Sequence, residues 1–263
     1  GRQIPRTFSR DLLSNTRGFD WYVSRHYALK TDLPADQARE TLLLLELALP
    51  HYTVIFGRPI AALDDRRMAL VFASSRNALE RAMISDHMHL LRLGGITQEG
   101  FWCAYQYASS PYHNRYIILH EATHLYQYCL GGTTRQFYGF FIEGIADFFS
   151  SHVYDPTTHS LTVNVLDRAP AHNHLASGLA EWHARGNPAF STLYDAADNG
   201  RGLDVVMTAF LQSTPEWEQK WRLYCDITLR RGQPGQPAKP LSDKLLYSLY
   251  GNRNELDAAF AAW

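Results

Sequence analysis

The feature that most constrains this chain is the segment RYIILHEATHLYQY, which runs from Arg115 to Tyr128. Apolar and aromatic residues occur on nearly every side of it, and this predicts a buried helix rather than an amphipathic surface helix. Within it, His120 and His124 stand four residues apart around Glu121. Positions i and i+4 share one face of a helix about 6 Å apart along the axis, so both imidazoles can bind one metal ion. Glu121 is rotated off that line, where its carboxylate can reach a metal-bound water.

Chance is the alternative explanation of this H-E-x-x-H pattern, because three fixed positions recur by accident in some chains of this size. Burial argues against chance. Two histidines and a glutamate in an apolar helix need partners, since an unsatisfied buried polar group is costly. We therefore interpret the pattern as a metal site.

A catalytic zinc site has three protein ligands and leaves one position for water. One form of the motif continues with Gly and His at set intervals, but Gln127 and Leu130 occupy those positions here, which excludes it. The next predicted helix, GFFIEGIADFFS (Gly139–Ser150), has two acids among its phenylalanines, Glu143 and Asp147. Two buried carboxylates need cationic or metal partners. We predict Glu143 as the third ligand and Asp147 as an acceptor for a histidine N–H.

The spacing of these residues resembles that of the gluzincin zinc peptidases, which include thermolysin-like enzymes and the large aminopeptidases. In this spacing the H-E-x-x-H motif is followed by eighteen residues, then by Glu, and by a second acid four residues later. The resemblance covers His120 to Asp147. It implies that His120, His124 and Glu143 hold one Zn²⁺ per chain. It further implies that Glu121 is the general base and that Asp147 is the partner of His120.

The order of the predicted elements is also similar to that of a bacterial peptidase-MA-like group. No G-x-M-E-N exopeptidase signature precedes the motif, so the resemblance favours an endopeptidase over an aminopeptidase. The gluzincins place a Tyr or His further along the chain to stabilise the oxyanion. Tyr194, His172 and His174 are the candidates here; the sequence does not choose among them, and Tyr194 is the one we carry forward.

The first half of the chain alternates predicted strands and helices. We expect a strand ending near Lys30, a helix from Pro34 that Pro50 ends or kinks, a buried strand from Arg67, a helix that starts at Ser75, a chain break at Gly94-Gly95, and a strand within 100–109. The second half begins with a loop or irregular hairpin over 154–173. Helices follow, one starting at Thr214-Pro215 and closing at 230–232, with a linker over 233–240 and two short helices at the end.

These elements predict an α+β, zincin-like fold. Residues 1–153 form an N-terminal α/β subdomain with a mixed sheet and both the H-E-x-x-H and Glu helices. Residues 154–263 form a mostly helical C-terminal subdomain that completes the cleft.

Composition narrows the function further. The 263 residues are 46% hydrophobic and carry a formal net charge of −1. The chain therefore lacks the excess of basic residues that is typical of nucleic-acid-binding proteins. The richest apolar run, TLLLLELALP, is too short to be a transmembrane segment. The chain begins at Gly1 without a signal peptide, and secreted, periplasmic and lipid-anchored locations stay open in case such a signal was removed. Cys103, Cys129 and Cys225 are more typical of three reduced cysteines than of one disulfide and a free thiol.

The sequence therefore predicts a zinc metallopeptidase that acts on a peptide or protein substrate, with the strand within 100–109 as the sheet edge that pairs with extended substrate. The alternative is a peptide-binding or scaffold protein that retains a structural zinc site without turnover. A hydrolase of non-peptide amides is a third reading. Glu121 argues against the scaffold, because a purely structural site does not need it.

Overall fold

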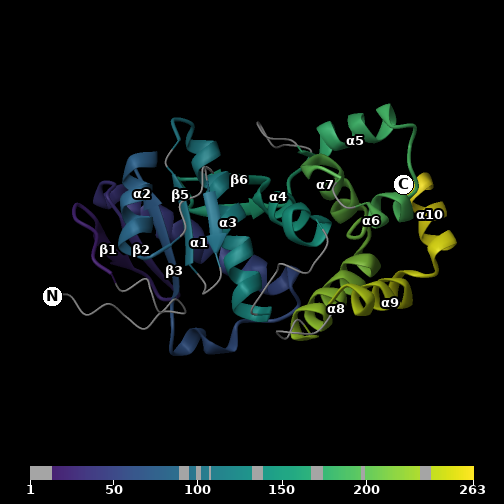
Figure 1. The fold of residues 1–263 in the computed structure, drawn as a ribbon, viewed down its shortest axis with the longest axis horizontal. Coiled ribbons are helices and arrows are strands. Elements are labelled where there is room, and N and C mark those ends of the chain that lie inside the picture. Colours follow the sequence, from purple (N-terminus) through teal and green to yellow (C-terminus); the bar gives the residue numbers. More distant parts are fainter. Residues whose placement is uncertain are drawn as a thin grey trace. The chain divides into compact units, whose positions relative to one another are not determined.

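The computed structural model describes residues 14–88, 95–98, 102–106, 108–131, 139–166, 174–196, 199–231 and 238–263. These residues form an α+β protein (Figure 1) with two compact units. The first unit consists of residues 1–51, 60–129 and 155–161, and the second of 52–59, 130–154 and 162–263. These units do not coincide with the predicted division after residue 153. The Glu143 helix is grouped with the C-terminal helices, because it packs on one of them.

The first unit is built on a five-stranded mixed sheet with the strand order β1-β2-β3-β5-β4. The central strands β2 (Tyr27–Thr31), β3 (Met68–Ala73) and β5 (Trp102–Gln106) are parallel. The strands β1 (Asp20–Val23) and β4 (Gly95–Gln98) run antiparallel to their neighbours and form the two edges. Every residue of β2 and β3 is buried, as expected of parallel strands covered on both faces.

Helices cover both faces of this sheet. Helix α2 (Arg76–Ser85) is capped by the Ser75 hydroxyl and packs on Val71 and its neighbours on one face of β3. Phe72 points to the opposite face, because successive side chains of a strand alternate. There it meets side chains of α1 (Ala35–Ile55) and α3 (Pro111–Gly131), the helix that carries the H-E-x-x-H motif. A 3₁₀ turn, η2 (Ala61–Asp64), connects α1 to β3.

The structure differs from two expectations about the early elements. The predicted strand up to Lys30 is two strands, because a turn at Ser24–His26 folds β1 back on β2. The carboxylate of Glu46 on α1 accepts bonds from the His26 backbone N–H and Nδ1, which holds that turn. Helix α1 does not end at Pro50 but continues to Ile55, because buried side chains such as Tyr52 hold its last turn.

A strand begins at the predicted chain break. Gly95 is the first residue of β4, which pairs with β5 in the register Gly95↔Tyr105. As a result β5 has a partner on each side and is not the sheet edge, which corrects the edge strand predicted within 100–109. Within the described residues, the edge next to β5 is β4.

The second unit is mostly helical. It contains a π-helical segment, helices α4 to α10 and most of a two-stranded sheet, with these bounds: η3 Phe140–Gly144, α4 Ile145–Ser150, β6 His152–Asp155, β7 Ser160–Val163, α5 His174–Ala184, α6 Phe190–Asp195, α7 Arg201–Phe210, α8 Pro215–Arg231, α9 Ala238–Tyr250 and α10 Arg253–Ala262. The predicted hairpin after residue 153 is the β6–β7 pair. The predicted linker is helical from Ala238 onward, and its preceding residues lie outside the described part of the chain.

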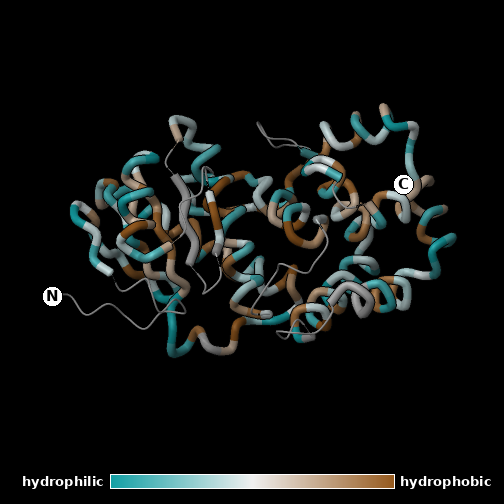
Figure 2. The backbone as a smooth tube through the Cα atoms, in the orientation of Figure 1, coloured by the Kyte–Doolittle hydropathy of each residue, from teal (hydrophilic) through white to brown (hydrophobic). Residues whose placement is uncertain are grey.

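The core of the second unit is aromatic. Helix α7 is buried along most of its length, and Phe210 packs edge-on against Trp217 and Phe260. Trp221 is fully buried and contacts Phe141 of the π-helical segment. Hydrophobic and hydrophilic residues alternate along these helices (Figure 2), as expected of helices with one face in a core.

Two further predictions concern the thiols and the membrane. Cys129 and Cys225 are free, and burial raises the pKa of both thiols well above the ordinary value, so neither is suited to act as a thiolate nucleophile. The Cys103 side chain lies outside the described part of the structure. Among the described helices, none combines the length and the apolar character needed to span a bilayer.

Candidate metal centre

The two histidines of α3 turn their Nε2 atoms toward one another. These atoms are 3.1 Å apart, and the two rings meet edge-on at an interplanar angle of 87°. Nitrogen ligands of a tetrahedral zinc, each about 2.05 Å from the ion, lie about 3.3 Å apart. The convergence of His120 and His124 therefore fits a shared metal ion, as the i, i+4 spacing predicts.

Gln127 holds the second of these rings. Its side-chain Oε1 lies 3.3 Å from His124 Nδ1, and Gln127 is fully buried. An amide oxygen only accepts hydrogen bonds, so this contact places the ring proton of His124 on Nδ1 and leaves the Nε2 lone pair for a metal. The sequence analysis used Gln127 only to exclude an extended motif and missed this role. Its position three residues after His124, on the same helical face, was the available signal.

Glu143 is the third member of this cluster. One atom from each of His120, His124 and Glu143 lies within 4.8 Å of the other two. Two imidazole nitrogens and one carboxylate oxygen form a donor set that suits a catalytic zinc ion. The residues that the sequence analysis predicted as ligands are thus brought together.

Glu143 lies in a π-helical segment, whereas the sequence analysis predicted a regular helix. The Ile145 N–H donates to the Phe140 carbonyl, five residues back. Single-turn π segments often occur at functional sites, because they reorient a side chain within a helix. Gly144 lets this segment lie against α7, since a Cβ there would come within 2.4 Å of the Asp204 carbonyl oxygen.

Glu121 projects from α3 toward the sheet edge. The Thr97 hydroxyl of β4 lies 2.8 Å from Glu121 Oε2 and 3.1 Å from the Glu121 backbone oxygen. Glu121 is only 6% exposed. The predicted base is therefore a nearly buried carboxylate with a hydroxyl donor, and the sequence contained no signal for this contact because β4 itself was missed.

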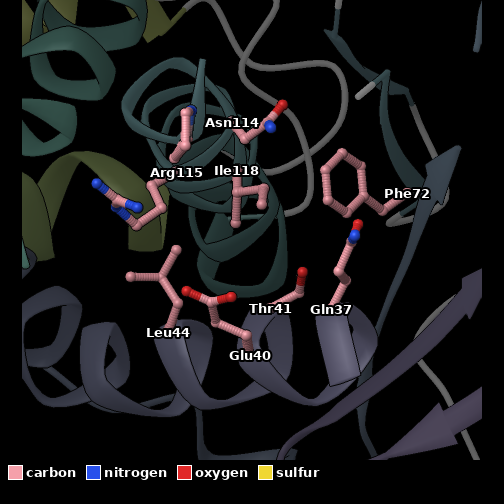
Figure 3. Close-up of a pocket in the computed structure, with 9 residues that line it drawn as sticks. Gln37, Glu40, Thr41, Leu44, Phe72, Asn114, Arg115 and Ile118 are labelled. Atoms are coloured by element: carbon pink, nitrogen blue, oxygen red, sulfur yellow. The ribbon is translucent and has the colours of Figure 1, made fainter. Parts of the chain in front are cut away.

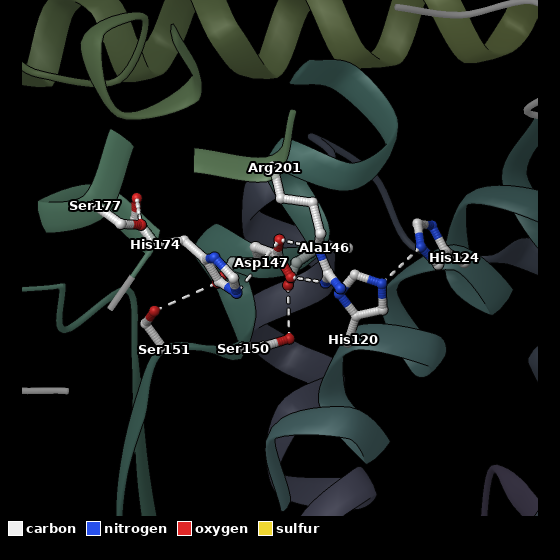
Figure 4. A network of polar contacts seen from close by, with 9 residues as sticks. All are labelled: His120, His124, Ala146, Asp147, Ser150, Ser151, His174, Ser177 and Arg201. Carbon is white, nitrogen blue, oxygen red and sulfur yellow. Dashed lines mark hydrogen bonds and ion pairs between the residues drawn. The ribbon is translucent and has the colours of Figure 1, made fainter. Parts of the chain in front are cut away.

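Asp147 lies in a polar network of the second unit (Figure 4). Its carboxylate is 1% exposed and receives two bonds from the Arg201 guanidinium, with Nε to Oδ2 at 2.7 Å. Nε2 of His174 lies 3.9 Å from the same carboxylate. A buried acid in an apolar helix indicated a cationic partner, but the sequence alone did not identify Arg201 among many arginines. The predicted role of Asp147 in orienting His120 stays a prediction.

The oxyanion candidates have different surroundings. Tyr194 is 2% exposed, and its hydroxyl donates to Asp243 Oδ1 over 2.7 Å. His174 is partly exposed at the start of α5, and His172 lies outside the described residues. The hydroxyl proton of Tyr194 is therefore engaged with the carboxylate of Asp243, while the ring of His174 lies beside the carboxylate of Asp147.

A separate pocket of about 190 Å³ lies between α1, α3 and β3 (Figure 3). Glu40 on α1 and Arg115 on α3 contribute charged groups to it, and Phe72 of β3 supplies an apolar wall. No residue of the predicted metal centre lines this pocket.

No protein-family model matches the chain, and no curated protein shows significant sequence similarity to it. The site is therefore interpreted from its own residues.

Proposed function

We propose that this protein is a zinc-dependent hydrolase that cleaves peptide bonds, with Glu121 as the general base. The observation that carries the proposal is the convergence of His120, His124 and Glu143, whose ligand atoms lie within 4.8 Å of one another. A gluzincin-like endopeptidase with a zincin-like fold is the specific form that the H-E-x-x-H-x18-E spacing favours.

The three residues would hold one Zn²⁺ ion. When bound, zinc supplies a Lewis acid that polarises a carbonyl, and it lowers the pKa of its water to about 7. Gln127 supports this arrangement by keeping the ring proton of His124 away from the ligand nitrogen. Asp147 would orient His120 in the same way, with its own carboxylate held by Arg201.

Glu121 is the residue that would move the proton. Its carboxylate accepts a proton from the attacking water and returns it to the leaving amine. It stands next to His120 in sequence but off the ligand line of the helix, so it would not itself be a metal ligand. Tyr194 and His174 are the two described candidates for the oxyanion donor; the Tyr194 hydroxyl donates to Asp243, and Nε2 of His174 lies 3.9 Å from the Asp147 carboxylate.

The substrate would pair with β4. This strand is a sheet edge within the described residues, and its Thr97 contacts the proposed base. An extended peptide can add to such an edge by main-chain hydrogen bonds, and this mode of binding is largely independent of sequence. Pairing there would bring a peptide bond close to Glu121.

The first test is metal content. Protein purified without chelator should contain about one equivalent of zinc, as a site with three protein ligands implies. The His120→Ala/His124→Ala double variant should lose the metal. His113→Ala, on the same helix but outside the ligand pair, is the matched control and should retain it. Full zinc retention in the double variant would rule out these ligands.

The second test separates an enzyme from a binding protein. Glu121→Gln keeps the size of the side chain and removes its ability to take a proton. Hydrolysis of casein and of peptide libraries should fall by at least roughly 10²–10⁴-fold, the range typical of general acid–base catalysis. Zinc content and melting temperature should barely change.

The contrary outcomes of this second test are specific. A parent protein that contains zinc and binds peptides but cleaves none across a broad library would favour the scaffold reading. Loss of zinc together with activity in Glu121→Gln would make Glu121 structural.

A further inference from the structure

Strand β4 has one face on a core and the other on Glu121. Ile96 packs against the α2 cluster around Val71 and Leu79 on one side of the sheet. Side chains alternate along a strand, so Gly95 and Thr97 both face the opposite side, toward α3. Both of them meet the same residue there, Glu121.

Gly95 leaves space for the Glu121 carboxylate. A Cβ at position 95 would come within 2.6 Å of Glu121 Oε1 and 2.8 Å of its Cγ, closer than real Cβ contacts occur. The Gly95 backbone has no positive φ, so its conformation does not require glycine. The reason for glycine at this position is therefore the space that the Glu121 side chain occupies.

Thr97 holds the carboxylate in that space. Its hydroxyl has a single proton and lies 2.8 Å from Oε2, the shorter of its two contacts with Glu121. Because the contact with Oε2 is the shorter one, the proton is best donated to the carboxylate. The bond also fixes which carboxylate oxygen lies at Thr97 and which lies in the space at Gly95.

We infer that β4 is a positioning element for the general base: Thr97 anchors one oxygen of the Glu121 carboxylate, and Gly95 leaves room for the other. The inference rests on the proposed function for its catalytic meaning, while the contact itself does not depend on a bound metal. Thr97 and Gly95 are positioning residues, because they act through Glu121. The same strand would then pair with the substrate and hold the base, and so align the two.

The first test uses the hydroxyl of Thr97. Thr97→Val has nearly the same shape but no donor, and it should lower kcat roughly 10- to 100-fold, the size of effect expected when a reacting group is misplaced. KM and zinc content should change less than about twofold, because neither ligands nor strand backbone change. Thr97→Ser restores the donor and should recover most of kcat. Thr123→Val is the matched control, because it removes a buried hydroxyl of α3 that bonds to Leu119 O.

The second test uses the space at Gly95. Gly95→Ala should displace the Glu121 carboxylate, which is the movable end of a flexible side chain, so the fold should tolerate the change. We expect kcat to fall at least as far as in Thr97→Val, with zinc content and melting temperature close to those of the parent. An alanine variant with parental kcat would contradict the role of Gly95.

A double-mutant cycle tests the contact without any turnover. Thr97→Val should lower the urea midpoint of the parent, and it should lower that of Glu121→Ala by at most about half as much, because its main acceptor is gone. Additive effects would overturn the inference even if the protein is a peptidase. A clear coupling in a protein that cleaves nothing would instead keep the contact and reject the proposed function.

Discussion

Lys30 and Asp86 form an ion pair from which water is excluded, since both side chains are 0% exposed. Lys30 belongs to the central strand β2, and Asp86 caps the C-terminus of α2. Desolvation lowers the pKa of Lys30, and the hydrogen bond and charge of Asp86 oppose that effect. The pair therefore connects α2 to the sheet. The positive charge of Lys30 is stabilised by the Asp86 carboxylate.

Removing one partner of this pair should be costly. Asp86→Asn should lower the free energy of unfolding by about 3–5 kcal/mol, because it leaves the lysine charge buried without its counter-ion. Urea denaturation measures this change. The double variant Lys30→Met/Asp86→Leu should recover most of the loss. Arg76→Ala, which breaks a half-exposed pair with Glu80 on the same α2 helix, is the control and should cost below about 1 kcal/mol. An Asp86→Asn effect no larger than this control would contradict the argument.

Glu46 makes the stability of the β1–β2 turn depend on pH. Burial alone would raise its pKa, but hydrogen bonds from Ser24 and His26 outweigh burial and lower the pKa below the ordinary 4.5. The unfolded chain then binds this proton more readily than the folded protein. The stabilisation is present above pH 4.5 and is lost as the pH falls through the lowered pKa of the folded state.

Glu46→Gln should therefore destabilise the protein at neutral pH by about 1.5–3 kcal/mol, the range for hydrogen bonds to charged groups. The difference from the parent should shrink below about pH 4.5, as measured by urea midpoints between pH 3 and 7. In a His26→Ala background the same substitution should cost less. A difference that stays constant with pH would show that the Glu46 charge is not involved.

At the scale of elements, the contact between α4 and the start of α7 is a buried acid held by a bidentate arginine. Asp147 is 1% exposed, whereas the Arg201 side chain is 48% exposed. The planar guanidinium fits both carboxylate oxygens, and a lysine would reach only one of them at a time. This pair ties α4, which continues directly from the Glu143 segment, to the main buried helix of the second unit.

Asp147→Asn should keep the fold and weaken zinc binding by roughly 10–100-fold, as expected if Asp147 orients His120. Arg201→Lys should have a smaller effect in the same direction, because it keeps the charge but loses the bidentate geometry. Competition with a chromophoric chelator measures both affinities. Arg185→Gln, which breaks an exposed pair with Glu181, is the control and should bind zinc like the parent. If Asp147→Asn binds zinc with the affinity of the parent, Asp147 serves only as a structural partner of Arg201.

At the scale of the whole molecule, metal binding and folding are linked. A metal that binds only the folded state stabilises it by about 2.7 kcal/mol when its concentration is 100 times its Kd. In a chain of 263 residues, 1 kcal/mol shifts the melting temperature by roughly 2–4 °C. Each of the two units has its own apolar core, so neither is expected to unfold completely without metal.

Removing the metal with a chelator should therefore lower the melting temperature by roughly 5–10 °C while leaving a cooperative transition. Calorimetry of the parent with and without chelator measures the shift, and added zinc should reverse it. The His120→Ala/His124→Ala variant should not respond to the chelator. An equal shift in that variant would mean that the chelator acts at another site.

The candidate ligand cluster could be predicted from sequence because its signal is local. His120 and His124 are four residues apart on one helix, and helical geometry alone places them on one face. Glu143 was predicted to lie with them because a carboxylate in an apolar helix needs a partner. Helix starts at Ser75 and Thr214-Pro215 depend on one or two residues and were predicted for the same reason.

The strand β4 and its contacts with Glu121 could not be predicted, because they depend on which segments become neighbours in the sheet. From sequence alone, Gly95 indicates a chain break. The structure pairs it with Tyr105 of β5, and the absence of a side chain at Gly95 leaves space for the Glu121 carboxylate. The continuation of α1 past Pro50 was decided in the same way, by buried side chains such as Tyr52 that outweigh the local penalty of proline. Arg201 binds Asp147 although the two are 54 residues apart in sequence, and at that separation the sequence spacing does not indicate a contact. Local spacing determined which side chains form the candidate metal cluster, and long-range packing decided what surrounds them and Glu121.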